Sequence, residues 1–386
     1  MEVYLDFENG CPLPQEVLEE MLPYFNEKGF GHSALTHKRG WEAYGIIEEN
    51  TKEIAELLGT ESNKIYFAHD AVEGANLAIL GLEPKDKRNK ILISKIEPLH
   101  FQYPVEEMKK RGFEVIKVPV DREGFLDEEL LFKNIDENTH LFIFSWINHE
   151  IGTVQNFEEI CKKVKEKYPT IYILSDLSDT TGRIPFKIND LPIDMAIFSG
   201  YKIYGPKGIG ILYKKSEVKL NPLIYGPFST QPLWPGEENI PAIVGLKKAL
   251  KILIENYREN QLKIKKYQEK LMKGLLQIPH TFLNGSKEKR AFDNVNISFL
   301  GCEGEAMTVE LSDMGIYISS GSACTRRILQ PSHVLLALGK KYEEAHGSLL
   351  MKLWPYHKEE EIEYVIDTFP KAVERIRKIS GFKGGL

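Results

Sequence analysis

The chain has 386 residues, of which 42% are hydrophobic and 27% are charged, and its formal net charge at pH 7 is −6. The hydrophobic fraction is enough for a sizeable core and excludes a disordered or fibrous protein. The excess of acidic residues gives no general positive field for nucleic acid or an anionic membrane, and no apolar stretch approaches the roughly 18 residues of a membrane span. Residues 1–7 resemble a strand and not a basic segment followed by an apolar one, so we expect a cytoplasmic protein with no nucleic-acid or membrane partner.

The first two thirds of the chain alternate short apolar runs with helical patterns. This alternation predicts βαβ units and a mostly parallel sheet, whose ligands lie at the carboxyl ends of the strands. The expected strands are 64–68, 90–94, 114–118, 140–146, 170–175, 194–199 and 210–213, and the expected helices are 71–81, 105–111 and 157–167.

The pattern changes in the last third of the chain. Residues 240–276 form a long amphipathic stretch, which we expect to lead the chain out of a large domain. A smaller α+β segment follows, with expected strands 295–299 and 316–319 and expected helices 303–314, 331–338 and 358–379. The predicted domains are therefore a large one over 12–260 and a small one made of 1–11 and 261–386.

Cysteine is rare in this chain, and its positions exclude two classes of protein. No pair has the spacing of a zinc ribbon or finger, and the number is too small for a disulfide scaffold. The cysteines are Cys11, Cys161, Cys302 and Cys324. Cys324 lies among the small polar residues Ser-Ser-Gly-Ser-Ala-Cys-Thr, and Arg326 and Arg327 follow it. We predict an accessible thiol with a lowered pKa at Cys324, and inert thiols at the other positions.

A lysine follows the apolar strand 194–198, within Phe-Ser-Gly-Tyr-Lys-Ile-Tyr-Gly-Pro-Lys-Gly-Ile-Gly. We expect burial at the strand end to lower the pKa of this residue, Lys202, and to make it an amine nucleophile for a Schiff base. Ser199 and the backbone of Gly200 could hold an anion beside it. The alternative is a surface lysine in a glycine-rich loop.

An aspartate ends the preceding strand pattern. Asp176 lies 26 residues before Lys202, so both side chains are expected at the carboxyl ends of strands and in one crevice. An aspartate for a pyridinium nitrogen and a lysine for the aldehyde are the groups that pyridoxal phosphate (PLP) most needs. The spacing alone leaves open whether Asp176 has this role or only caps the next segment.

These motifs resemble those of the NifS-like cysteine desulfurases, and the resemblance runs nearly from end to end. It implies the aspartate aminotransferase-like fold of PLP-dependent transferases, a class V aminotransferase with a large α/β domain and a small α+β domain. Besides the lysine and cysteine loops, it rests on Tyr4-Leu-Asp-Phe, Phe30-Gly, Asn76-Leu-Ala-Ile, Asn148-His-Glu-Ile-Gly and Ile243-Val-Gly.

The resemblance also implies an activity and a set of site residues. Lys202 would hold PLP, Asp176 would pair with the ring nitrogen, and Cys324 would take sulfur from cysteine as a persulfide and leave alanine. The other positions that match cofactor-binding residues are Ser199, His149, Asp179 and Tyr201. The family forms homodimers in which the partner subunit completes each site, and the sulfur would pass to an acceptor such as an iron-sulfur cluster scaffold or a thiolation protein.

Several positions depart from the family at the phosphate end of the cofactor. The family's Ser-Gly-Ala-Thr-Glu is His69-Asp-Ala-Val-Glu here, so Val72 lacks a hydroxyl donor and Asp70 adds a negative charge. Glu237 replaces a hydroxyl that the partner subunit offers, and it would repel a phosphate as well.

Further departures concern the ring and the substrate. The chain has Tyr201 and Pro98 for histidines (with His100 two residues after Pro98), His149 and His32 for asparagines, Asp179 for a glutamine, and Leu350 for an arginine. Arginine is the usual anchor for a carboxylate, and leucine cannot replace it. Lys352 is the nearest cation, and we expect it to project from another face of the strand.

Three hypotheses follow. The first is a divergent PLP-dependent cysteine desulfurase acting on an amino acid through Lys202, Asp176 and Cys324. The second is a PLP enzyme for a different amine, and the third is a paralogue without PLP that serves as a sulfur carrier or scaffold. No metal site is expected, because ligand pairs at helix or turn spacing are absent.

Overall fold

The structure is a computed structural model that describes residues 1–83, 87–227, 230–321 and 331–382. Its largest sheet has seven strands: β2 (Ile65–Ala68), β3 (Lys90–Ser94), β4 (Glu114–Val118), β5 (Thr139–Ile143), β6 (Tyr172–Asp176), β7 (Met195–Ser199) and β8 (Gly210–Lys214). Their order is β2-β8-β7-β6-β5-β3-β4. All neighbours from β7 to β4 run parallel, whereas β8 is antiparallel to β7 and to β2, so the predicted mostly parallel sheet is confirmed.

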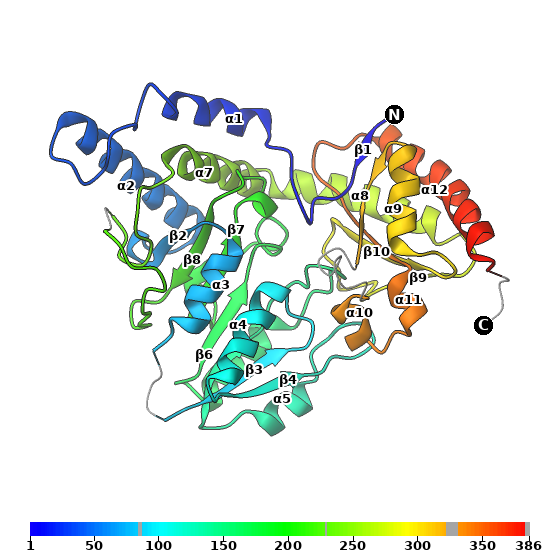
Figure 1. Ribbon diagram of the computed structural model, residues 1–386, viewed down its shortest axis with the longest axis horizontal. Helices are drawn as coiled ribbons and strands as arrows, with labels where there is room; N and C mark the ends of the chain where they lie inside the picture. Colours follow the sequence, from blue (N-terminus) through cyan, green and yellow to red (C-terminus); the bar gives the residue numbers. More distant parts are fainter. Residues whose placement is uncertain (84–86, 228–229, 322–330, 383–386) are drawn as a thin grey trace.

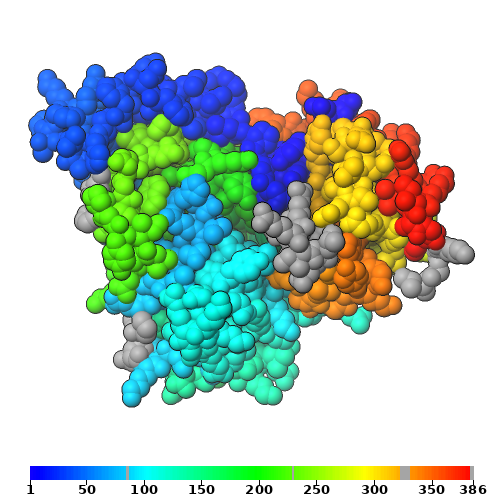
Figure 2. Space-filling view, viewed as in Figure 1, coloured from blue at the N-terminus to red at the C-terminus, as the bar shows by residue number. Residues whose placement is uncertain are grey.

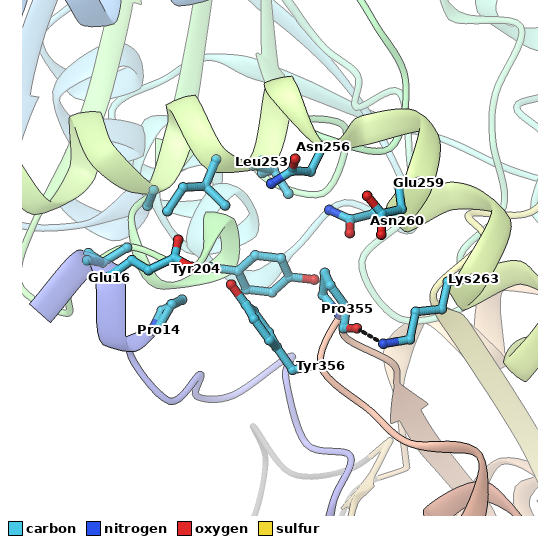
Figure 3. A pocket seen from close by; sticks show the side chains of 13 residues that line it. Pro14, Glu16, Tyr204, Leu253, Asn256, Glu259, Asn260, Lys263, Pro355 and Tyr356 are labelled. Atoms are coloured by element: carbon cyan, nitrogen blue, oxygen red, sulfur yellow. Dashed lines mark hydrogen bonds between the residues drawn. The ribbon is translucent and has the colours of Figure 1, made fainter.

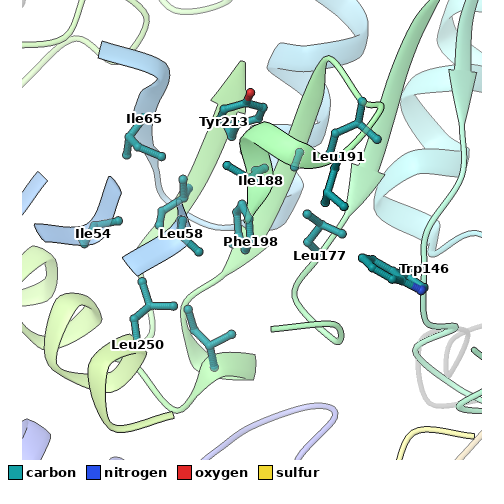
Figure 4. Packing of buried hydrophobic residues seen from close by; sticks show 14 of the residues in the cluster. Ile54, Leu58, Ile65, Trp146, Leu177, Ile188, Leu191, Phe198, Tyr213 and Leu250 are labelled. Carbon is teal, nitrogen blue, oxygen red and sulfur yellow. The ribbon is translucent and has the colours of Figure 1, made fainter. Parts of the chain in front are cut away.

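Helices cover both faces of this sheet (Figure 1). They are α1 (Gln15–Met21), α2 (Lys38–Leu58), α3 (Ala71–Leu80), α4 (Leu99–Lys110), α5 (Glu128–Asn134), α6 (Phe157–Lys167) and α7 (Ile240–Glu255), with short 3-10 turns η1 (Leu22–Tyr24), η2 (Ser62–Lys64), η3 (Ile188–Asp190) and η4 (Tyr201–Ile203). Ile197 of β7 packs with α3 and α4, whereas Phe198 packs with α2 and α7 on the other face (Figure 4). Since successive strand residues point to opposite faces of the sheet, the apolar residues of these buried strands pack against the helices on both sides.

A second, smaller core contains most of the remaining chain (yellow to red in Figure 1). An antiparallel sheet in the order β12 (Ser319–Ser320), β13 (Ser348–Lys352), β10 (Asn294–Phe299) and β9 (Thr281–Leu283) packs with α8 (Tyr257–Leu275), α9 (Gly304–Asp313) and α12 (Glu359–Ser380). β1 (Val3–Tyr4) pairs in parallel with β11 (Ile316–Tyr317), and α10 (His333–Ala337) and α11 (Tyr342–His346) lie nearby. The domain boundaries at 12–260 and at 1–11 with 261–386 stay a prediction.

Two of the predicted segments have different bounds in the structure. The amphipathic stretch 240–276 is divided at Asn256, where α7 ends and α8 begins. Helix α4 begins at Leu99, well before the expected start at 105, because Pro104 lies inside the helix and not at its first turn. Within the described ranges, no helix is long and apolar enough to cross a membrane.

Candidate active site

Lys202 and Asp176 lie at the same edge of the large sheet. Asp176 is the last residue of β6, and Lys202 lies in η4, directly after the neighbouring strand β7. Both are buried, with exposed fractions of 3% for Asp176 and 7% for Lys202. The strand ends thus bring together the two residues that the spacing places in one crevice.

Lys202 belongs to a buried ring of four charges, which we call the charge quartet: Glu8, Asp179, Lys202 and Lys352. Lys202 Nζ lies 2.5 Å from Glu8 Oε1 and 2.9 Å from Asp179 Oδ2. Lys352 Nζ lies 2.5 Å from the other Glu8 oxygen and also contacts Asp179 Oδ1. Each carboxylate therefore gives one oxygen to each lysine, and the formal charges sum to zero.

The quartet determines the charge of Lys202. Burial lowers the pKa of Lys202, but the carboxylates of Asp179 and Glu8 raise it, and the net pKa lies well above the usual value. Burial also raises the pKa of Asp179, but Lys202 and Lys352 bring it well below its usual range. The expectation of a lowered lysine pKa is therefore wrong for this state, in which Lys202 is an ammonium ion.

Lys352 lies in the site, contrary to the expectation that it projects away from it. It is separated from Leu350 by one residue on β13, and alternate residues of a strand share a face. Their partners on β10 are Asn294 and Asn296, whose side chains both donate to the carbonyl of Glu150, at 3.0 and 3.1 Å. This face of the smaller sheet thus faces the end of the large one.

Asp176 is held by an imidazole and by the backbone. His100 Nε2, near the start of α4, lies 3.1 Å from Asp176 Oδ2, and the amide of Ser178 donates to Oδ1 at 2.8 Å. Burial raises the pKa of Asp176, but the contact with His100 outweighs it and the net pKa is lowered. Asp176 is therefore a carboxylate at neutral pH, the form that a pyridinium nitrogen needs.

Three other predicted site residues lie around Lys202. Burial and the nearby Lys202 hold the pKa of His149 well below its usual range, so this imidazole is neutral, and its Nδ1 has no hydrogen-bond partner in the described part of the chain. The hydroxyl of Tyr201 donates to the carbonyl of Glu8 at 3.0 Å. The amide of Ser199 donates to Ser178 Oγ at 2.8 Å, which fixes the end of β7.

The N-terminus of α3 lies beside this lysine loop. Ser199 and Ala68 both pair with Gly210, so the start of α3 is only one strand away from Ser199. A Cβ on Gly210 would lie 2.8 Å from the Phe198 carbonyl oxygen and 2.9 Å from the carbonyl carbon of Asp70, so only glycine permits this approach. Helix N-termini bind phosphate through their free amides.

Carboxylates already cap this helix end. Asp70 Oδ1 accepts a hydrogen bond from the amide of Glu73 at 3.0 Å, and the Glu73 carboxylate accepts one from the amide of His69. The negative charge that the sequence predicts at Asp70 is therefore present at the helix terminus, where a phosphate would have to lie near it. Glu237, the other added acid, is exposed.

Cys324 lies outside the described residues. Described residues close to both ends of 322–330 lie near Glu150: Ser332 Oγ donates to Glu150 Oε2 at 2.6 Å, and a Cβ on Gly321 would lie 2.6 Å from Glu150 Oε1. Burial raises the pKa of Glu150 to about 8. The chain therefore enters and leaves this segment next to the site.

The other cysteines fit the prediction of inert thiols. Burial raises the pKa of Cys11 to about 12 and that of Cys302 to about 11, and it raises the pKa of Cys161 further. All three are free thiols in the structure. The described part of the chain holds no group of three or more histidine, cysteine, aspartate or glutamate residues that could bind a metal ion.

A cavity of about 290 Å³ lies behind the lysine loop (Figure 3). The side chain of Tyr204, two residues after Lys202, enters it beside Tyr356, and Lys263 donates to the carbonyl of Pro355 at its rim. Tyr204 has φ 63°, a left-handed conformation that is uncommon outside glycine. Lys202 does not line this cavity, so the cavity is separate from the charge quartet.

Comparisons with known proteins place this architecture in a family. The model of the class V aminotransferases matches residues 3–365, and the chain belongs to this family, whose fold is that of PLP-dependent enzymes. The chain is 36% identical over 379 residues to cysteine desulfurase IscS 1 of Archaeoglobus fulgidus, with 98% of each chain covered. It is 37% identical over 384 residues to cysteine desulfurase IscS of Clostridium botulinum, covering 98% of this chain and 96% of the relative.

Solved structures agree with the family. A structure described as a NifS-like protein superposes with a TM-score of 0.89 at 30% identity, covering 99% of this chain and all of the other. The NifS-like protein of Rickettsia africae gives a TM-score of 0.87 at 27% identity and covers 97% of this chain. The expected fold and the resemblance to NifS-like cysteine desulfurases are thereby confirmed.

The residues of the site fit PLP in their chemistry. Lys202 supplies a buried amine, Asp176 a buried and ionised carboxylate, and the N-terminus of α3 its amides, which Gly210 allows to lie close by. Side chains of this chain already contact each of these groups. The cofactor would therefore take over contacts that His100, Glu8 and Asp70 now make.

Proposed function

We propose that this chain is a PLP-dependent cysteine desulfurase that takes sulfur from cysteine onto Cys324 and leaves alanine. The observation that carries the proposal is the position of Lys202 and Asp176, both buried just after or at the carboxyl ends of the neighbouring strands β7 and β6. The similarity to proteins named cysteine desulfurase, which extends over 98% of the chain, supports it.

Bound PLP supplies an electron sink that weakens the bonds of an attached amino acid. Lys202 would hold the cofactor, and Asp176 would keep a proton on the ring nitrogen because its own pKa is lowered. Ser199 would offer its hydroxyl to the phosphate. Asp179 keeps its charge beside Lys202, so it can hold a proton on the nitrogen of Lys202 in place.

His149 and Tyr201 complete the proposed site. His149 is neutral, and its unpaired Nδ1 can accept or donate a proton as the substrate changes. Tyr201 holds the carbonyl of Glu8 and so positions the loop that carries this carboxylate. Together with the burial of the quartet, these contacts exclude water from the amine of Lys202.

We further propose a homodimer in the cytoplasm, in which Glu237 lies near the partner's site. The sulfur would pass from Cys324 to an acceptor protein, such as an iron-sulfur cluster scaffold or a thiolation protein. No direct contact with nucleic acid or a membrane is part of the proposal.

Specific observations favour the alternatives. The contact of His100 with Asp176 and the ion pairs of Lys202 would suit a paralogue that carries sulfur without PLP. Leu350, which cannot bind a carboxylate, would suit a PLP enzyme for an amine without one. Sulfide release from L-cysteine separates both alternatives from the main proposal.

The test of the proposal is sulfide release from L-cysteine by the PLP-treated protein in the presence of a thiol reductant. We expect Cys324→Ser to reduce the rate by about tenfold or more, because the thiolate is the nucleophile. Cys11→Ser is the matched control and should leave the rate unchanged. Equal rates in wild type and Cys324→Ser, or no sulfide from wild type, would contradict the proposal.

A further inference from the structure

The charge quartet shows how this site binds a carboxylate. The carboxylate of Glu8 bridges two ammonium groups, with one oxygen on Lys202 and the other on Lys352, each at 2.5 Å. Asp179 bridges the same two lysines from the other side. A small carboxylate that entered the quartet would find both ammonium groups already spaced for it.

The two carboxylates are anchored differently. Asp179 lies in the turn that follows β6, within a run of backbone hydrogen bonds that returns to Leu177. Glu8 lies in the loop between β1 and α1, outside both sheets, and has the highest side-chain exposure of the quartet, 12% against 5–7% for the others. Glu8 is therefore the carboxylate that a ligand can displace most easily.

The quartet also joins the two cores of the molecule. Lys202 and Asp179 follow strands β7 and β6 of the large sheet, whereas Lys352 ends β13 of the smaller one. Two residues just before Glu8 divide in the same way, since Leu5 packs in the smaller core and Phe7 in the larger one. The ion pair of Glu8 with Lys352 therefore lies where the two cores meet.

Removing four charges from water costs desolvation free energy, and a well-packed apolar cluster of similar volume is often at least as stable. The Arg183–Asp293 pair nearby shows the simpler arrangement, with two nitrogens of one arginine on a single carboxylate oxygen at 2.8 and 3.0 Å. A ring in which both carboxylates are shared between two lysines is not needed to neutralise Lys202. It is well suited to exchanging one ion pair for another.

We propose that Glu8 and Lys352 recognise the zwitterion of the substrate amino acid: its carboxylate replaces that of Glu8 on Lys352, and its ammonium group pairs with Glu8. This inference rests on the proposed function and names the residues that select the substrate. On β13, Leu350 shares the face of Lys352 and carries no charge, so Lys352 supplies the cation at this edge of the smaller sheet. Burial raises the pKa of Glu8, whereas the nearby Lys202 and Lys352 lower it, so the two lysines favour its charged form.

The test compares three thiols by isothermal titration calorimetry on the full chain under a thiol reductant, without PLP and with it. L-cysteine carries both charges, cysteamine lacks the carboxylate, and 3-mercaptopropionate lacks the ammonium group. Lys352→Met should lower the affinity for L-cysteine and 3-mercaptopropionate by about tenfold or more and leave the affinity for cysteamine unchanged. Glu8→Gln should lower the affinity for L-cysteine and cysteamine. The affinity of this variant for 3-mercaptopropionate should be no lower than that of wild type.

Lys165→Met is the matched control, because Lys165 forms a partly buried ion pair with Asp194 at 2.5 Å outside the quartet. It should leave the affinity for all three thiols unchanged. The inference would be overturned if a quartet variant lost affinity equally for all three thiols, or if the control lost affinity as well. It would also be overturned if wild type did not bind L-cysteine. Sulfide release reports on the proposed function separately, since a desulfurase with charge-independent binding would refute only the role of Glu8 and Lys352.

Discussion

Single residues decide how firmly this site can hold a phosphorylated cofactor. Asp70 caps α3 through the amide of Glu73, so its carboxylate serves the helix and opposes a phosphate at the same time. Lys202 is likewise fixed as an ammonium by Glu8 and Asp179. The residues closest to the proposed cofactor are therefore those whose present partners must change when it binds.

Asp70→Ser should increase the affinity for PLP by about fivefold, because a carboxylate near a phosphate costs about 1 kcal/mol at an effective surface dielectric. Serine still caps the helix, so the stability of α3 should be little affected. A fluorescence titration of the cofactor-free protein measures the affinity. Asp127→Ser, which changes the cap of the distant α5, should leave it unchanged, and an equal affinity in wild type and Asp70→Ser would show that Asp70 does not oppose the phosphate.

At the scale of elements, the approach of β8 to α3 positions the phosphate end of the site. Gly210 allows this contact, since a Cβ there would press against backbone atoms of Phe198 and Asp70, which cannot turn aside as a side chain could. Strand β8 also pairs with β7, which carries Ser199 to the same edge. A change at Gly210 therefore affects both the sheet and the lysine loop.

Gly210→Ala should lower the free energy of unfolding by about 2 kcal/mol or more through overpacking. Gly45→Ala is the matched control, because Gly45 lies within α2 and a Cβ there meets no atom within 4 Å; it should be neutral or stabilising by up to about 1 kcal/mol. Thermal unfolding of both variants measures the difference. If Gly210→Ala were as stable as Gly45→Ala, the close contact between β8 and α3 would not be a structural requirement.

The strands of the large sheet and their mostly parallel arrangement could be predicted because the central strands are buried on both faces and appear as largely apolar runs, as in β5, β6 and β7. Helix α2 was not predicted, since its charged residues are nearly as numerous as its apolar ones and its buried positions include Asn50 and Thr51. Strand β13 was missed for a related reason: all five of its residues are buried, so the sequence gives no alternation that would show which face Lys352 occupies.

For the whole molecule, the arrangement of the two cores explains what sequence reasoning could not find in the site. Lys202 and Asp176 follow or end neighbouring strands of one sheet, so their spacing along the chain predicted that both lie at the same edge of that sheet. Glu8 and Lys352 are 344 residues apart and meet only because the N-terminal segment crosses between the cores. In Figure 2 this segment (dark blue) lies between the green surface of the large part and the yellow surface of the smaller one.

If Lys202 is the residue that binds PLP, covalent trapping will identify it. The protein is incubated with PLP, reduced with borohydride, digested and examined by mass spectrometry. We expect a phosphopyridoxyl group on the peptide of Lys202, little on the exposed Lys207 of the same loop, and none at position 202 in Lys202→Arg, which keeps the charge of the quartet. A label spread evenly over surface lysines, with Lys202 unmodified, would show that Lys202 does not bind the cofactor.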